Sequence, residues 1–184
     1  MNSASIRVFK PNVSQDEAVR AFRSGSLTAA YWRVRCGPLR RIADVYVPFW
    51  VYRARYRMNS TLNTRIFALD AVYGALDLFE FKHPPHEAEL LHVNTRNRMA
   101  MRLDPRAGEE LVRTKVLRVL FSQGFFKLRT VGLEIERLPL ELYMPYWLAF
   151  YGQSESAAIR VLDAVRRRIE GAKAAAFFKE WLAA

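Results

Sequence analysis

The sequence has one cysteine, Cys36, and no apolar run as long as a membrane-spanning helix requires. A single cysteine excludes an intrachain disulfide and a cluster of thiolate metal ligands. The longest apolar runs, VYVPFWVY and YMPYWLAFY, fall well short of the roughly 20 residues needed to cross a bilayer. The start of the chain, MNSASIRVFKP, lacks the apolar core of a secretory signal. We therefore expect a cytoplasmic protein without a transmembrane segment.

Lysine is scarce as well: 6 lysines stand against 23 arginines, in a chain of net charge +11. The excess is spread evenly, with 13 basic and 8 acidic residues in 1–92 and 16 and 10 in 93–184. A basic folded surface attracts nucleic acid, an anionic membrane surface or an acidic protein, and arginine suits bidentate contacts with phosphate or carboxylate. An arginine-rich genome explains the same composition without any function, so composition leaves both interpretations open.

Catalytic and metal-binding motifs are also missing from the sequence. It contains no glycine-rich phosphate loop, no nucleophile elbow and no Ser-His-Asp order. The nearest approach to a metal cluster is His83, His86 and His92, beside Glu87 and Glu89. Two histidines that share a zinc ion on one helical face stand four residues apart, whereas His86 and His92 are six apart. We expect a solvated linker here, with neither metal nor cofactor.

The sequence does contain one unusual cluster twice, as YVPFW at 46–50 and YMPYW at 143–147. Other segments recur in the same order: EAVR and ELVR, YWRVRC and FFKLRT, and IFALDAV and IRVLDAV. The separation between the two copies stays between 93 and 97 residues. Because these anchors keep their order and spacing, we predict a tandem duplication.

The predicted fold is α+β, with each copy a helix followed by a three- or four-stranded antiparallel sheet and the copies related by a pseudo-two-fold axis. We expect residues 1–82 to form the first repeat, 83–99 a linker with a short helix, and 100–184 the second repeat with a terminal helix. Ser14 and Glu17 have the spacing of a capping box at the start of the first helix. In the second copy, apolar residues at helical spacing predict the matching helix from about residue 107 to 121.

Two strands of the first copy are predicted from alternation. The segment YWRVR sends Arg33 and Arg35 to one side, and a longer strand follows from about residue 42 to 57. Proline cannot donate to a sheet ladder, so Pro48 and its counterpart Pro145 should mark a bulge or an edge position.

The long strand also predicts a basic face. Arg53, Arg55 and Arg57 alternate with Tyr52, Ala54 and Tyr56, and the neighbouring predicted strand adds Arg33 and Arg35. We interpret these five arginines as a surface for an anionic partner, in a non-enzymatic binding or adaptor module. A solvated strand face without a partner is the alternative.

A second hypothesis is an enzyme or small-ligand binder with a cleft between the repeats. Its candidate residues are Tyr46, Trp50, Asp70, Tyr143, Trp147 and Asp163. Two carboxylates brought close together would have split proton affinities, as general acid and base pairs do. The competing interpretation is that Asp70 and Asp163 each bind backbone amides of their own turn.

The run VFKPNVSQDEAVRAF, the strand IADVYVPFWVYRARY and the turn ALDAVYG together resemble an uncharacterised bacterial domain that often follows a zinc ribbon. The most specific element is the Y-h-P-[FY]-W strand, where h is an apolar residue. The zinc-ribbon cysteines are absent, so that part of the resemblance does not extend to this chain. The D-A-x-x-G turn at 70–74 is also similar to small PepSY-type domains. Neither resemblance implies a catalytic residue.

Overall fold

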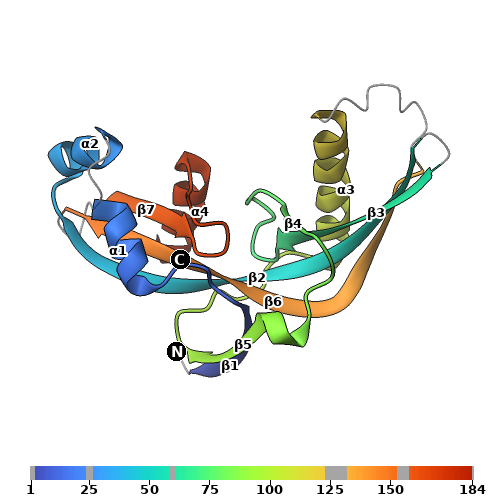
Figure 1. The fold of residues 1–184 in the computed structure, drawn as a ribbon, viewed down its shortest axis with the longest axis horizontal. Coiled ribbons are helices and arrows are strands. Elements are labelled where there is room, and N and C mark those ends of the chain that lie inside the picture. The colour runs from blue at the N-terminus through green and yellow to red at the C-terminus, as the bar shows by residue number, and fades with distance from the viewer. Residues whose placement is uncertain (1–2, 24–26, 59–60, 123–131, 153–157, 184) are drawn as a thin grey trace. The chain divides into compact units, whose positions relative to one another are not determined.

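A computed structural model describes residues 3–23, 27–58, 61–122, 132–152 and 158–183, which form a mixed α+β fold (Figure 1). The α-helices are α1 (Gln15–Arg23), α2 (Leu27–Cys36), α3 (Pro105–Ser122) and α4 (Ala172–Ala183). The strands are β1 (Ala4–Phe9), β2 (Leu39–Met58), β3 (Thr61–Asp70), β4 (Phe79–Phe81), β5 (Leu90–Thr95), β6 (Glu134–Tyr151), β7 (Ala158–Asp163) and β8 (Arg168–Ile169). A 3₁₀ helix, η1, spans Glu87–Glu89. Of the described helices, none combines the length and the apolar character that crossing a membrane requires.

The chain divides into two compact units. Unit 1 comprises Met1–Val47, Leu91–Met99 and Tyr143–Ala184, and unit 2 comprises Pro48–Leu90 and Ala100–Leu142. Each unit therefore takes segments from both halves of the sequence, and the long strands β2 and β6 each contribute one part to each unit. The segment Pro48–Leu90 runs through the boundary predicted after residue 82, whereas a change of unit falls at residue 100, where the second repeat was predicted to begin.

The described strands form one mixed sheet in the order β4-β3-β2-β6-β1-β5, with β7 and then β8 added beside β6. The β2–β3, β3–β4, β6–β7 and β7–β8 pairs are antiparallel, as expected. The β1–β6 pair is parallel, with Val8 opposite Tyr143, so the prediction of purely antiparallel sheets is wrong. The parallel pair arises because the chain begins with a short strand, β1, ahead of the first helix. Ile6 and Val8 are the buried residues of this strand.

Each proline of the repeated cluster lies where a long strand changes its neighbour. Before Pro48, Tyr46 forms a parallel bridge with Arg98, and after it Phe49 pairs antiparallel with Asp70. A residue without an N–H fits this position, because the change of neighbour leaves it no ladder bond to donate.

Pro145 has the same local surroundings. Tyr143 before it pairs in parallel with Val8, and Tyr146 after it pairs antiparallel with Asp163. The carbonyl of Pro145 accepts a hydrogen bond from the amide of Ala164 (3.1 Å), as the carbonyl of Pro48 does from Ala71 (2.8 Å). Both prolines thus still contribute an acceptor to the backbone network.

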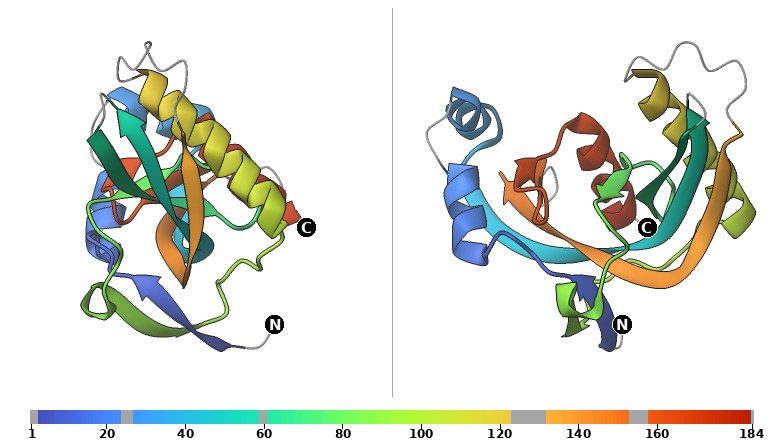
Figure 2. Two further views of the ribbon diagram at one scale, coloured as in Figure 1. Left: turned by 90° about the vertical axis from the view of Figure 1, so that its right-hand side faces the viewer. Right: turned by 45° about the vertical axis from the view of Figure 1, so that its right-hand side comes forward.

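Unit 2 has its core between α3 and one face of β2 and β3 (Figures 1 and 2). Along the helix, Val112, Val116 and Leu120 are buried at intervals of four residues, as the helical period predicts. On the strands, they meet the buried side chains of Trp50, Tyr52, Ala54, Tyr56, Phe67 and Leu69. The helix was predicted over 107–121, close to its observed bounds.

In unit 1, α1 packs on the end of β6 and on β7. Ala18 and Phe22 of the helix are buried with Ala149, Tyr151 and Leu162. The predicted capping box is confirmed, because the amide of Ser14 donates to Glu17 Oε2 (2.8 Å) and the amide of Glu17 donates to Ser14 Oγ (3.3 Å). Burial of Ala174, Phe177 and Phe178 anchors α4, the predicted terminal helix.

The segment predicted as a strand from YWRVR is instead helix α2. Trp32 and Cys36 are half-buried four residues apart, whereas Tyr31 and Val34 are exposed, which is a helical period. Four alternating residues are too few to separate the two periods, and Ala29 and Ala30 before them favour a helix. The counterpart at Lys127 and Arg129 lies outside the described residues.

The predicted linker at 83–99 contains the expected short helix, η1. It also contains β5, which was not predicted from the sequence. Leu90 and Thr95 are the buried residues of this strand, and the residues between them are exposed or half-buried. Such a pattern has no alternation to identify it as a strand.

Candidate functional site

Three strand-face arginines, Arg53, Arg55 and Arg57, lie on the side of β2 that faces away from α3. Their neighbours Tyr52 and Ala54 belong to the core beneath that helix, so the predicted alternation is confirmed. Arg57 is exposed, and Arg53 and Arg55 are half-buried.

Carboxylates from β6 partly neutralise this face. Glu136 Oε2 lies 2.9 Å from a guanidinium nitrogen of Arg53 and 3.1 Å from one of Arg55, and Glu134 lies 4.0 Å from Arg55. Exposed pairs of this kind add little stability, typically about 0.2–1 kcal/mol each. The two glutamates matter more for binding than for stability. Three cations beside two anions leave little net charge on this face to attract an anionic partner.

Arg33 and Arg35 do not join the strand-face arginines in a strand ladder, because both belong to helix α2. The guanidinium of Arg35 lies 5.7 Å from the centre of the Tyr31 ring, one helical turn earlier. The side chain of Arg33 lies outside the described part of the structure. The strand position predicted for Arg33 and Arg35 is therefore wrong, and the basic face of β2 consists of Arg53, Arg55 and Arg57.

Asp70 and Asp163 are both buried and bind backbone amides. The carboxylate of Asp70 accepts hydrogen bonds from the amides of Tyr73, Gly74 and Leu76 at 2.8–2.9 Å. Gly74 has φ +63°, so the turn that Asp70 closes uses the freedom of glycine. At Asp70, these hydrogen bonds agree with the interpretation that the aspartate binds backbone amides of its own turn.

Asp163 forms the equivalent turn in unit 1. Its Oδ1 accepts hydrogen bonds from the amides of Val165 and Arg166, both at 2.8 Å. Its Oδ2 has no hydrogen bond in the described structure but lies 3.7 Å from the guanidinium of Arg166. Neither aspartate presents a carboxylate to an open surface, since both are at most 1% exposed.

The four aromatic cleft candidates have different surroundings. Trp50 is buried under α3. Tyr143 is half-buried and lies opposite Val8 in the β1–β6 pair. Trp147 is half-buried and donates its indole N–H to the carbonyl of Val13 (3.1 Å). Burial and the neighbouring Asp44 raise the pKa of Tyr46 well above its usual value. None of the four lines the pocket described below.

Two of the three histidines in the 83–99 segment, His83 and His86, interact with each other and with Glu89. The rings of His83 and His86 are stacked at 4.9 Å, and His83 Nδ1 lies 3.8 Å from Glu89 Oε2. Oε2 of Glu89 also accepts a hydrogen bond from the backbone amide of His86 at 2.9 Å. In the described residues, no three histidine, cysteine or acidic side chains are placed to hold a metal ion.

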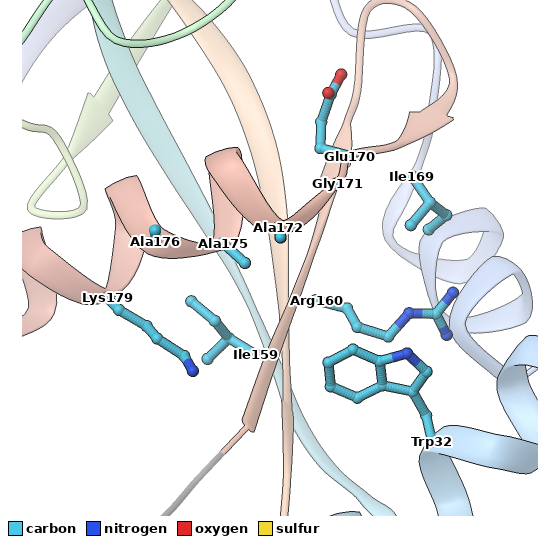
Figure 3. A pocket seen from close by; sticks show the side chains of 10 residues that line it. All are labelled: Trp32, Ile159, Arg160, Ile169, Glu170, Gly171, Ala172, Ala175, Ala176 and Lys179. Atoms are coloured by element: carbon cyan, nitrogen blue, oxygen red, sulfur yellow. The ribbon is translucent and has the colours of Figure 1, made fainter.

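Unit 1 contains a pocket of about 440 Å³ between α2, β7 and the start of α4 (Figure 3). Its lining is mostly apolar, with alanines on the pocket side of α4. The residues that line it are Trp32, Ile159, Arg160, Ile169, Glu170, Gly171, Ala172, Ala175, Ala176 and Lys179. A concave apolar site with few polar groups has the character of a small-ligand site.

Arg160 is the one buried cation of this lining, with 7% of its surface exposed. Its guanidinium lies 5.8 Å from the ring centre of Phe22 and 5.7 Å from that of Trp32, so aromatic rings adjoin it from α1 and α2. Its hydrogen bond in the described structure goes to the Tyr151 hydroxyl at 3.5 Å, the outer limit for such a bond. No described carboxylate lies within ion-pair distance of it.

Arg160 was not among the residues predicted from the sequence, although the repeat contains a signal for it. In IFALDAV, the residue three positions before Asp70 is Phe67. In IRVLDAV, the residue three positions before Asp163 is Arg160. Phe67 is a core residue of unit 2. A charged residue where the other copy has a core aromatic indicates a buried cation, and buried cations require a partner.

Comparisons with protein-family models, with curated proteins and with solved structures gave no match. The resemblance to the domain that follows a zinc ribbon therefore stays a prediction.

Proposed function

We propose that this protein is a non-enzymatic binding module for an anionic partner, and that Arg160 is the residue that contacts the anion. The observation that carries the proposal is the buried guanidinium of Arg160, which lines a pocket and has no described carboxylate partner. The net charge of +11 favours the approach of an anion to any site on this protein.

Burial makes the charge of Arg160 energetically demanding. An ion transferred from water into a protein interior loses several kcal/mol of hydration, which an opposite charge or good hydrogen bonds must offset. One long hydrogen bond and two aromatic contacts offset only a part of it. An anion in the pocket would supply the remainder, and this requirement is the source of the expected affinity.

The binding role is preferred over an enzyme because the carboxylates of the repeat are already engaged. Asp70 and Asp163, the candidates for acid–base chemistry, hold backbone amides in two buried turns. A catalytic acid or base must instead reach its substrate within hydrogen-bond distance. The strand-face arginines support the same binding function less strongly, because Glu134 and Glu136 lie beside them.

We also propose that the repeats predicted at 1–82 and 100–184 arose by duplication. The support is local: in both units the carbonyl of a strand proline accepts the amide of the alanine that follows the buried aspartate. The register is equivalent too, with Phe49 opposite Asp70 and Tyr146 opposite Asp163. A superposition of the backbone of residues 48–71 on that of 145–164 tests this, and unrelated backbone paths there would contradict it.

The binding proposal is tested with simple anions and two matched variants. We expect acetate or inorganic phosphate to raise the melting temperature of the wild-type protein and not that of Arg160→Met. Arg57→Met removes the same charge from the strand face and should respond as the wild type does. If Arg57→Met loses the response and Arg160→Met retains it, the strand face is the binding site. If no anion at low salt stabilises the wild type, the proposal is wrong.

A further inference from the structure

We infer that the unit 1 pocket takes an apolar monocarboxylate, with its carboxylate on Arg160 and its apolar body along α4. This inference rests on the proposed function and specifies the class of ligand. The position of the guanidinium, the composition of the walls and the other charges of the pocket each support it.

The guanidinium of Arg160 is suited to a planar anion approached from its edge. The aromatic rings of Phe22 and Trp32 are its cation–π partners, and they contribute no conventional hydrogen-bond acceptor for its N–H groups. A guanidinium has five N–H donors in its plane, and a carboxylate accepts two of them in parallel. Figure 3 shows the guanidinium beside the Trp32 indole, among the side chains that line the pocket.

The body of the pocket is apolar and is hollow because α4 presents alanines to it. Ala172, Ala175 and Ala176 follow the helical spacing of one face, and Ile159 and Ile169 complete the walls. Alanines alone would not define a site. Arg160, which is buried, lines the same pocket, so an apolar wall and a cation belong to one site.

The remaining charges of the pocket favour a singly charged ligand. Glu170 lines the pocket, but its carboxylate is paired with Arg168, with N–O distances of 2.9–3.1 Å. Lys179, the last α4 residue that lines the pocket, is exposed. A phosphate dianion or a nucleotide would need more buried donors than one guanidinium supplies, whereas a carboxylate matches it in charge and geometry.

The inference is tested by calorimetric titration with acetate, butyrate and octanoate, each also compared with its neutral amide. We expect the affinity to rise about fourfold per added methylene until the pocket is filled, as burial of about 0.8 kcal/mol per CH₂ implies. The amides should bind at least tenfold more weakly than the acids. An apolar tripeptide and its C-terminal amide test whether the carboxylate of a peptide serves as well as that of a free acid.

Two variants separate the head of the ligand from its body. Arg160→Met should abolish binding of all the acids. Ala175→Leu, which fills the hollow, should abolish the chain-length gain while acetate still binds, and Ala183→Leu on the exposed end of α4 is the matched control.

The outcomes distinguish this inference from the proposed function. Arg160-dependent binding of acetate or phosphate without any chain-length gain would refute the apolar body and leave the anion site standing. Tighter binding of inorganic phosphate than of octanoate would refute the carboxylate. Octanoate binding that survives Arg160→Met would refute the assigned head group, and an absence of Arg160-dependent binding of any anion would refute both proposals.

Discussion

Arg160→Met should make the ligand-free protein more stable. Methionine fills a similar volume and contacts the same rings, but it carries no charge to desolvate. The substitution removes a penalty of several kcal/mol for an ion without a described counter-ion, and loses two cation–π contacts of about 1–2 kcal/mol each. The Tyr151 hydroxyl keeps its bond to the carbonyl of Phe22 at 3.2 Å. We expect a net gain of about 2 kcal/mol.

The assay is a thermal melt in a low-salt buffer free of carboxylates and phosphate. For a chain of this length, a gain of about 2 kcal/mol corresponds to a rise of about 4–8 °C in the melting temperature. Octanoate should then raise the melting temperature of the wild type and not that of the variant, because a ligand stabilises only the folded state that binds it. A variant that melts more than about 4 °C below the wild type without ligand would show that Arg160 is a structural anchor, and the functional argument would fail.

Three further predictions concern the core, the strand face and a buried tyrosine. Trp50→Ala should lower the free energy of unfolding by about 3–5 kcal/mol in urea titrations, and Trp147→Ala by less because Trp147 is half-buried. Replacing all three strand-face arginines by serine should change the free energy of unfolding by less than about 1 kcal/mol. If the protein binds single-stranded DNA, the slope of log K against log salt concentration should become shallower by at most about three. An unchanged slope would exclude this face as the DNA contact. Burial raises the pKa of Tyr52 to about 12, so the folded state resists its ionisation and stability should fall as the pH rises above about 10. Tyr52→Phe should weaken that loss in melts between pH 9 and 12, and an identical pH profile would contradict it.

The sequence predicted the elements whose hydrophobic period extends over several turns or many strand residues. Residues 107–121 carry apolar positions at helical spacing, and α3 forms there. The alternation of the strand-face arginines with Tyr52 and Tyr56 continues long enough to fix both faces of β2. The capping box of α1 was readable because both of its hydrogen bonds join residues three apart in sequence.

The features that the sequence did not reveal depend on tertiary contacts. Helix α2 was mistaken for a strand because its four alternating residues carry no decisive period, and burial of Trp32 and Cys36 on one side became visible only in the fold. The composition of the units was missed for a different reason. Local patterns do not specify that α1 packs on β7, or that α3 packs on β3, because the contacting residues lie far apart in sequence.

The position of Arg160 links the repeat to the proposed site. Residues three before the buried aspartate are Phe67 in one copy and Arg160 in the other, and both lie on strands that pair antiparallel with the segment after the proline. In unit 2 the aromatic side chain is part of the core and is also the cation–π partner of Arg65, which is paired with Glu80. In unit 1 the cation occupies the buried position itself, beside rings from α1 and α2 and without a described carboxylate. A substitution that only preserved the fold would have kept a hydrophobic residue there, since a buried charge destabilises unless it is paired. The difference between the two positions supports the proposal that a ligand supplies the opposite charge at Arg160, and therefore that unit 1 carries the proposed binding role.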